Sequence, residues 1–277
     1  MAVSVRLFVT DLDGTLVPSG HEVSTENVRA VREAVQRGVV VTIATGRMYR
    51  ATLPLAKKLG VDVPLITYNG ALIKSVQGEV LYSSFLAPEL IHEVIDFCRE
   101  RGWHVQLFSE DMLYFAAENK YTDFYIANQQ VPWNAVGWDG MKKQTRDVTK
   151  LLVISDGIEE TNARIAQLRE HFGDRISAVR SNPCLAEITN LGVSKAAALE
   201  RLAEKLGIPM EETMAIGDSD NDVPMLKAAG KSVAMGNALP HIKEMADFVT
   251  GNCAEDGFAK AIYKYVLHRQ ERGDDYE

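Results

Sequence analysis

Two aspartates stand two residues apart, directly after an apolar run near the start of the chain. Asp11 and Asp13 belong to the stretch 11–16 (DLDGTL), which follows the run 5–9 (VRLFV). In extended chain the rise is about 3.3 Å per residue, so the two carboxylates can face one side, roughly 6–7 Å apart. Like charges that close repel each other unless a cation, a proton or a reacting group lies between them. The pattern indicates carboxylate chemistry at a strand end, with an ordinary acidic turn as the alternative.

Three further polar clusters each follow an apolar run that is typical of a strand. They are Thr45-Gly46-Arg47, Asn69-Gly70 and the acidic segment 217–222, which contains Asp218, Asn221 and Asp222. In an open parallel sheet, ligands bind at the carboxyl ends of the strands. Four strands therefore bring polar residues to one edge, which predicts a single composite site.

Carboxylates dominate this composite site. Asp218 and Asp222 add to Asp11 and Asp13. Oxygen ligands in this number favour a hard cation, and Mg²⁺ usually takes one or two protein carboxylates together with water and phosphate oxygens. An alternative for Asp222 is the first turn of a helix, where a carboxylate stabilises the helix dipole.

Other residues of these clusters can bind an anion. Thr45 lies between a strand and a helix, so its hydroxyl and nearby amides can hold a phosphoryl oxygen. Lys195 opens a helix, where a lysine is mildly unfavourable, and it can offset the carboxylates and a substrate phosphate. The alternatives are a plain turn at Thr45, a solvated Lys195, and a structural carboxylate partner for Arg47. Asn69 with Gly70 is typical of a turn, with a substrate contact as the alternative.

The predicted elements place these clusters on a parallel sheet. Strands and helices alternate over residues 1–84 and 190–277, which favours right-handed crossovers and a doubly wound, Rossmann-like α/β fold. Residues 85–189 instead repeat a helix followed by two strands, as in a small α+β domain with an antiparallel sheet. We expect a discontinuous core, 1–84 and 190–277, with the domain 85–189 inserted and hinges near 83–88 and 190–194.

Specific elements follow from the same patterns. We expect core strands at 5–9, 39–44, 64–68, 213–217 and 232–235, and core helices at 24–36, 195–206, 221–229, 239–246 and 256–268. In the inserted domain we expect helices at 88–101, 121–128 and 159–172, hairpins at 103–116 and 176–189, and a strand at 150–155. The segment between 128 and 150 has no clear assignment.

Composition and missing motifs exclude several other classes of protein. The 277 residues are 46% hydrophobic with a net charge of −8, which favours a globular protein that binds neither nucleic acid nor a membrane. The first residues lack a secretory signal, so we expect a cytoplasmic location. The three cysteines and six histidines lack disulfide or metal-site spacing. Neither a P-loop nor a dinucleotide-binding glycine motif is present.

The ordered motifs resemble those of the haloacid dehalogenase superfamily. The resemblance rests on Asp11-Leu12-Asp13-Gly14-Thr15, Thr45-Gly46-Arg47, Lys195 and the segment 217–222. The large insertion between the second and third motifs, together with Asn69-Gly70-Ala71, is similar to the Cof-type phosphatases. Ala196 follows the lysine where the family commonly has glycine, and we expect little effect because alanine favours a helix.

The resemblance implies a Mg²⁺-dependent phosphatase for small phosphorylated metabolites, such as sugar phosphates or phosphorylated cofactors. It implies that Asp11 is the nucleophile that forms an aspartyl-phosphate, that Asp13 is the general acid and base, and that Lys195 neutralises Asp11. The implied metal ligands are Asp11, the Asp13 backbone carbonyl and Asp218, with Asp222 either ligating or orienting a bound water. The implied phosphoryl-binding residues are Thr45 and Asn221, with Gly46, Arg47 and Asn69 as further candidates.

Two other functions remain open at this point. A phosphosugar mutase would need a second phosphate site in the inserted domain, for which the candidates are Lys142, Lys143, Arg146 and Arg180. A non-catalytic phosphate-sensing protein would have lost a nucleophile, acid or metal ligand, and all of these are present. Tyr114, Arg180 and Glu187 are candidates to face the crevice between the domains. The sequence supports no prediction of the oligomeric state.

Overall fold

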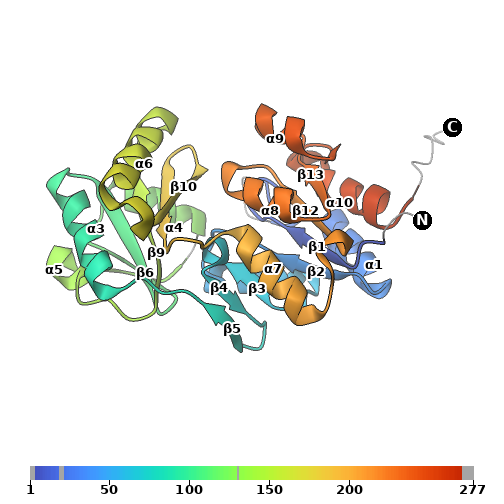
Figure 1. Ribbon diagram of the computed structural model, residues 1–277, viewed down its shortest axis with the longest axis horizontal. Coiled ribbons are helices and arrows are strands. Elements are labelled where there is room, and N and C mark those ends of the chain that lie inside the picture. Colours follow the sequence, from blue (N-terminus) through green and yellow to red (C-terminus); the bar gives the residue numbers. More distant parts are fainter. Residues whose placement is uncertain (1–3, 19–21, 130, 270–277) are drawn as a thin grey trace.

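The computed structural model describes residues 4–18, 22–129 and 131–269 of the chain. The elements gather into two lobes (Figure 1). One lobe contains a parallel sheet, and the other contains a six-stranded sheet. The fold is therefore α/β with a parallel-sheet core and additional sheets, as the sequence predicts.

Five parallel strands form the core sheet in the order β14-β13-β12-β1-β2. They are β1 (Leu7–Thr10), β2 (Val40–Ile43), β12 (Thr213–Gly217), β13 (Lys231–Ala234) and β14 (Phe248–Val249). Residue Val9 of β1 is paired in parallel with Thr42 of β2 and Ala215 of β12. The segments that follow β1, β2 and β12 therefore leave the same edge of the sheet, although they are far apart in sequence.

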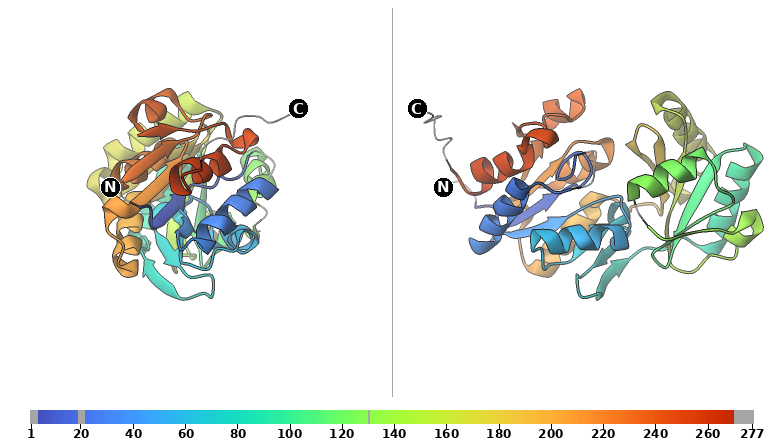
Figure 2. Two further views of the ribbon diagram at one scale, coloured as in Figure 1. Left: turned by 90° about the vertical axis from the view of Figure 1, so that its right-hand side faces the viewer. Right: turned by 180° about the vertical axis from the view of Figure 1, so that it is seen from behind.

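Helices cover both faces of this sheet. In Figure 1 α7 (Lys195–Leu206) and α8 (Val223–Ala228) lie in front of it, whereas α1 (Thr25–Gln36), α2 (Tyr49–Leu59) and α10 (Gly257–Ala261) lie in front in the reverse view (Figure 2). The short helix α9 (Pro240–Met245) and a π-helical turn (Ile262–Val266) complete the set. The hydroxyls of Ser24 and Ser194 cap α1 and α7, and such caps satisfy backbone donors at the start of a helix.

A small antiparallel sheet corrects one expectation. The segment predicted as the strand 64–68 forms β3 (Leu65–Thr67), which meets the parallel sheet through a single bridge between Ala44 and Ile66. Its ladder partner is β4 (Leu72–Lys74), followed by β5 (Val80–Ser83), and neither strand was predicted. The residues of β5 are exposed or half-buried, although three of the four are apolar.

The six-stranded sheet has the order β10-β11-β9-β6-β7-β8. Its strands are β6 (His104–Ser109), β7 (Met112–Phe115), β8 (Trp133–Ala135), β9 (Val148–Ile154), β10 (Ser177–Asn182) and β11 (Leu185–Thr189). Its helices are α3 (Pro88–Glu100), α4 (Lys120–Gln129), α5 (Gly137–Met141) and α6 (Ile158–Phe172). The two predicted hairpins, β6–β7 and β10–β11, are confirmed. Strand β8 and helix α5 occupy the segment that had no assignment.

The chain passes between the lobes at two neighbouring points. The side-chain amide of Asn190 donates hydrogen bonds to Ser84 Oγ (3.0 Å) and to the backbone carbonyl of Phe85 (2.8 Å). The two segments predicted as hinges are thus joined to each other. Domain boundaries at 84/85 and 189/190, and a hinge motion there, stay predictions. No helix in the described ranges is long and apolar enough to cross a membrane, and the cytoplasmic location also stays a prediction.

Candidate active site

Three aspartates converge at the carboxyl edge of the parallel sheet. Asp11 follows β1, and Asp218 and Asp222 follow the adjacent strand β12. One carboxylate oxygen of each lies within 4.8 Å of the others. Asp11 is 5% exposed and Asp222 is fully buried. The convergence expected from strand ends is therefore present.

A buried ammonium lies among these carboxylates. Lys195 Nζ donates to Asp11 Oδ1 at 2.5 Å and to Asp222 Oδ1 at 2.6 Å, and its side chain is completely buried. Lys195 is the first residue of α7, which Ser194 caps. The preceding backbone packs tightly against the turn after β3, because a Cβ on Gly70 would lie 2.3 Å from the Ser194 carbonyl oxygen.

Asp222 is held on both of its oxygens. Its Oδ1 accepts from Lys195, and its Oδ2 accepts from the backbone N–H groups of Asp218 and Ser219, both at 3.0 Å. The side chain therefore fixes the loop that carries Asp218. The oxygens of Asp218 accept from the hydroxyls of Thr15 (2.8 Å) and Ser219 (3.0 Å).

Gly14 is required where the Asp11 loop passes the Asp218 side chain. A Cβ at Gly14 would lie 2.6 Å from Asp218 Oδ2, and the residue has φ of +83°. Both the contact and the left-handed backbone favour glycine here. The glycine thus lets the loops after β1 and β12 approach each other closely.

The site carries more negative than positive charge. Burial and the Asp222 carboxylate raise the pKa of Asp11 well above its ordinary value, although Lys195 opposes the shift. Burial and the same carboxylate raise the pKa of Asp218 to about 6. For Lys195, burial by itself lowers the pKa, but Asp11 and Asp222 outweigh it and raise the pKa above its ordinary value. Burial is the largest cause of the two carboxyl shifts, and the crowding of carboxylates adds to it.

The donor set fits a hard divalent cation. The clustered ligand atoms are all carboxylate oxygens, which are the ligands that Mg²⁺ prefers. After burial, the neighbouring carboxylates are the next cause of the raised pKa values of Asp11 and Asp218, and a bound cation would offset that repulsion. Since Asp11 and Asp218 line the cavity, whereas Asp222 is fully buried and does not, Asp11 and Asp218 are the better placed ligands.

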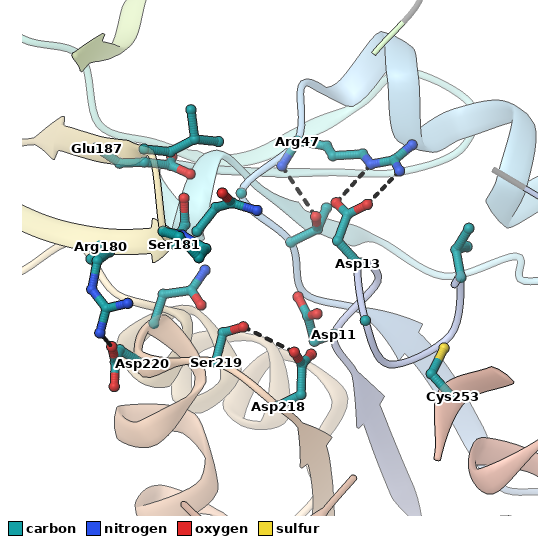
Figure 3. A pocket seen from close by; sticks show the side chains of 18 of the residues that line it. Asp11, Asp13, Arg47, Arg180, Ser181, Glu187, Asp218, Ser219, Asp220 and Cys253 are labelled. Carbon is teal, nitrogen blue, oxygen red and sulfur yellow. Dashed lines mark hydrogen bonds and ion pairs between the residues drawn. The ribbon is translucent and has the colours of Figure 1, made fainter. Parts of the chain in front are cut away.

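Asp13 forms an ion pair with Arg47. The guanidinium donates from Nε to Asp13 Oδ2 at 2.8 Å and from Nη2 to Oδ1 at 2.5 Å (Figure 3). Arg47 is 7% exposed, whereas the Asp13 side chain is 53% exposed. The structural carboxylate partner considered for Arg47 is therefore present, and it orients Asp13 at the cavity.

Two further candidates, Thr45 and Asn69, lie beside each other at the loop after β2, where the Asn69 backbone N–H donates to the Thr45 carbonyl at 2.9 Å. Thr45 Oγ1 accepts from the backbone N–H of Arg47 at 3.1 Å. Asn69, with φ of +56°, accepts from Asn221 Nδ2 at 3.0 Å on its side-chain oxygen and donates to Glu187 Oε2 at 2.9 Å. Asn69 is therefore bonded to both lobes.

A cavity of about 940 Å³ joins the predicted residues to the six-stranded lobe. Figure 3 shows the labelled side chains around it. Its lining includes, from the core, Asp11, Asp13, Thr45, Gly46, Arg47, Asp218 and Asn221. From the other lobe it includes Phe124, Tyr125, Lys150, Ile158, Arg180, Pro183, Leu185 and Glu187. Of the predicted residues, Asn69, Asp222, Lys195 and Tyr114 are not among the lining.

Two residues were misjudged or missed from the sequence. Asp220, which was given no role in the segment 217–222, forms an ion pair with Arg180 of the other lobe and also contacts His241 (2.9 Å). Lys150 was missed, although a lysine at the edge of the apolar run 151–154 is a weak signal of a buried charge. That signal is ambiguous, because a lysine at a strand end is usually solvated.

The basic residues considered for a second phosphate site are mostly paired elsewhere. Lys142 pairs with Asp96 at 2.5 Å, and Arg146 pairs with Glu110 at 3.3 Å. Of the four candidates only Arg180 lines the cavity, where it pairs with Asp220. This arrangement does not assemble a second phosphate site.

Comparison with known proteins identifies the family. The model of the haloacid dehalogenase-like hydrolases matches residues 8–262. A 5-amino-6-(5-phospho-D-ribitylamino)uracil phosphatase of Bacillus subtilis is 36% identical, covering 96% of this chain and 97% of its own length. An HMP-PP phosphatase of Serratia proteamaculans is 32% identical, covering 95% and 94%.

Solved structures agree with this result. A haloacid dehalogenase-like hydrolase of Bacteroides thetaiotaomicron superposes with a TM-score of 0.85 at 29% identity, over 94% of this chain and 99% of that one. A sugar phosphatase of subclass IIB of the superfamily gives a TM-score of 0.81 at 26% identity, over 94% and 99%. The chain belongs to the haloacid dehalogenase-like hydrolases and is a phosphatase acting on phosphate esters.

Proposed function

We propose that this chain is a Mg²⁺-dependent phosphatase that hydrolyses small phosphorylated metabolites through an aspartyl-phosphate on Asp11. The observation that carries the proposal is Lys195, buried between Asp11 and Asp222 with Asp218 in reach of the same point. Lys195 opposes the rise in the pKa of Asp11, and so favours its ionised form, and its hydrogen bond orients Asp11 at the cavity, as a nucleophile requires. A purely structural ion pair would not need to place one of its carboxylates, Asp11, at the wall of a cavity.

The first half of the reaction transfers the phosphoryl group to the protein. A carboxylate oxygen of Asp11 attacks phosphorus and forms a new P–O bond, while the bond from phosphorus to the leaving oxygen breaks. Asp13, at the same rim of the cavity, acts here in its protonated form, without the charge of its ion pair with Arg47, and gives its proton to that oxygen, which releases an alcohol. Lys195 offsets charge near Asp11 in both states.

The second half returns the phosphoryl group to water. Asp13, now a carboxylate, takes a proton from a water molecule, whose oxygen attacks phosphorus and breaks the bond to Asp11. Inorganic phosphate leaves, and Asp13 is again protonated. Thr45, Gly46 and Asn221, which line the cavity, hold the phosphoryl oxygens in both halves.

Asp11, the Asp13 backbone carbonyl and Asp218 would hold the Mg²⁺, with Asp222 fixing the loop that carries Asp218. When bound, the ion supplies positive charge that stabilises the phosphoryl oxygens. Arg47 positions Asp13 through its paired hydrogen bonds.

The substrate class follows from the cavity and from the relatives. The relatives are named for a phosphoribitylaminouracil, for HMP-PP and for sugar phosphates. All of these are small phosphorylated metabolites, and a cavity of about 940 Å³ accommodates molecules of that size. The mutase alternative gains no support, because Lys142, Arg146 and Arg180 are paired with carboxylates and do not form a second phosphate site.

The test is hydrolysis of p-nitrophenyl phosphate by the full chain, with and without Mg²⁺, followed by a screen of phosphorylated metabolites. We expect Mg²⁺-dependent phosphate release, and Asp11→Asn should lower kcat by about four orders of magnitude because it removes the nucleophile. A folded Asp11→Asn variant that keeps turnover would refute the nucleophile. Release of little phosphate unless a bisphosphate is added would instead favour a mutase.

A further inference from the structure

A second buried ion pair lies at the cavity, in the six-stranded lobe. Lys150 of β9 and Glu187 of β11 face each other across neighbouring strands, with Nζ 2.7 Å from Oε2. Their side chains are 2% and 4% exposed. Removing two charges from water is so unfavourable that such a pair needs further hydrogen bonds.

Those further hydrogen bonds come from the parallel-sheet lobe. Lys150 Nζ also donates to the backbone carbonyl of Gly46 at 2.6 Å, and Asn69 Nδ2 donates to Glu187 Oε2 at 2.9 Å. The absence of a Cβ at Gly46 favours this close approach, because a Cβ there would lie 2.8 Å from Glu187 Oε1. The ion pair therefore spans the two lobes.

The contact with Gly46 fixes one peptide plane. In the peptide between Gly46 and Arg47, the carbonyl oxygen accepts from Lys150 and the N–H donates to Thr45 Oγ1 at 3.1 Å. Both polar groups of this peptide are thus held from opposite sides. The backbone N–H of Gly46 has no acceptor in the described ranges of the chain, so it is free to donate to a bound anion.

The contact with Asn69 extends to another loop. Asn69 Oδ1 accepts from Asn221 Nδ2 at 3.0 Å. Glu187, Asn69 and Asn221 therefore form a continuous hydrogen-bonded chain from β11 to the loop after β12. This chain orients the Asn221 side chain, whose amide would otherwise rotate freely at the cavity wall.

We propose that Lys150 and Glu187 are positioning residues for phosphoryl transfer. From the inserted lobe they hold the Gly46 backbone and the Asn221 amide in the geometry that receives the transferred phosphoryl group. This inference rests on the proposed function. It differs from a role in choosing the substrate, because both residues act through groups that hold the phosphoryl and not through the leaving group.

The experiment compares Lys150→Met, Glu187→Gln and the double variant in the full chain with saturating Mg²⁺. The probes are p-nitrophenyl phosphate and β-glycerophosphate, which share the phosphoryl group and differ in the leaving group. We expect kcat/KM to fall by on the order of 10²-fold, by the same factor for both probes, with most of the loss in kcat. The double variant should lose little more than either single variant, because the two residues act as one unit.

Stability must be measured beside activity. A buried ion pair replaced on both sides by neutral side chains of similar shape leaves stability nearly unchanged in many proteins, so the double variant should melt within a few degrees of wild type. Lys120→Met and Glu93→Gln are matched controls, since Lys120 and Glu93 form exposed ion pairs in the same lobe. Both controls should keep wild-type kinetics.

Three results would overturn the inference. The first is a wild-type kcat/KM in the double variant. The second is a loss of kcat/KM with only one of the two probes, which would indicate that the residues contact the leaving group. The third is an equal loss of kcat/KM in Lys120→Met. A wild-type enzyme that hydrolyses neither probe would overturn the proposed function and this inference with it. That failure is distinguishable because it appears before any variant is made.

Discussion

The molecule contains two buried lysines at one cavity, and they differ in how their charge is balanced. Lys195 lies between two carboxylates, with a third in reach, and belongs entirely to the parallel-sheet lobe. Lys150 has one carboxylate partner and one backbone carbonyl, and its contacts join the two lobes. Both side chains are almost completely excluded from solvent.

The difference shows what each cluster is able to do. Around Lys195 the negative charge is in excess, which adds to burial in raising the pKa values of Asp11 and Asp218. Such a cluster gains stability from a cation and is suited to a reaction that moves charge. The Lys150 pair is complete without any further ion, so it is suited to holding geometry.

The largest expected effect comes from breaking the first cluster. Lys195→Met leaves Asp11 and Asp222 facing each other without a cation, so we expect a loss of about 3–5 kcal/mol in the free energy of unfolding together with loss of activity. Lys150→Met should be less destabilising, because Glu187 keeps its hydrogen bond from Asn69. Urea unfolding in EDTA measures both variants. Equal losses would mean that the two clusters do not differ in charge balance.

A smaller effect should follow from adding the cation. Mg²⁺ at about 100 times its Kd should stabilise the folded chain by about 2.7 kcal/mol, because it binds the native state alone. Asp218→Asn removes one of the clustered carboxylates and should abolish this stabilisation, whereas Glu187→Gln should keep it. Melting curves at several Mg²⁺ concentrations provide the measurement. A Mg²⁺ response that survives in Asp218→Asn would place the ion elsewhere.

The last expected effect concerns pH in the absence of metal. The pKa of Asp218 is raised from 3.8 to about 6 on folding, so the folded state binds the proton more tightly than the unfolded state. Its contribution to stability is present below about pH 4 and is lost as the pH rises through about 6. We expect Asp218→Asn in EDTA to remove this part of the pH dependence. Parallel stability curves for both proteins between pH 4 and 7 would argue against the shift.

The parallel-sheet lobe was largely predictable because its signals are local. A buried apolar run followed by a glycine-containing polar turn identifies a strand end, and parallel strands bring such ends together. The segments after β1, β2 and β12 were found in this way, and their convergence is confirmed. The failures lie at β4 and β5, which are short, and β5 is half-exposed.

The contacts between the lobes were less predictable because their signals are not local. Arg180 and Asp220 are 40 residues apart, Lys150 and Gly46 are 104 apart, and Asn69 and Glu187 are 118 apart. No periodicity links such residues. Their meeting depends on strand register in the six-stranded sheet, where a shift of one residue moves every side chain to the other face.

The sequence by itself determined the α/β class, the strand-end aspartates and the lysine that meets them, because a parallel sheet collects its strand ends at one edge whatever connects them. The tertiary structure alone decided that Arg47 pairs with Asp13 and that Lys150 and Glu187 close against Gly46 and Asn69. The physical reason is desolvation. A buried charge takes whichever partner the packing of distant segments brings within hydrogen-bond distance, and no local pattern records that choice.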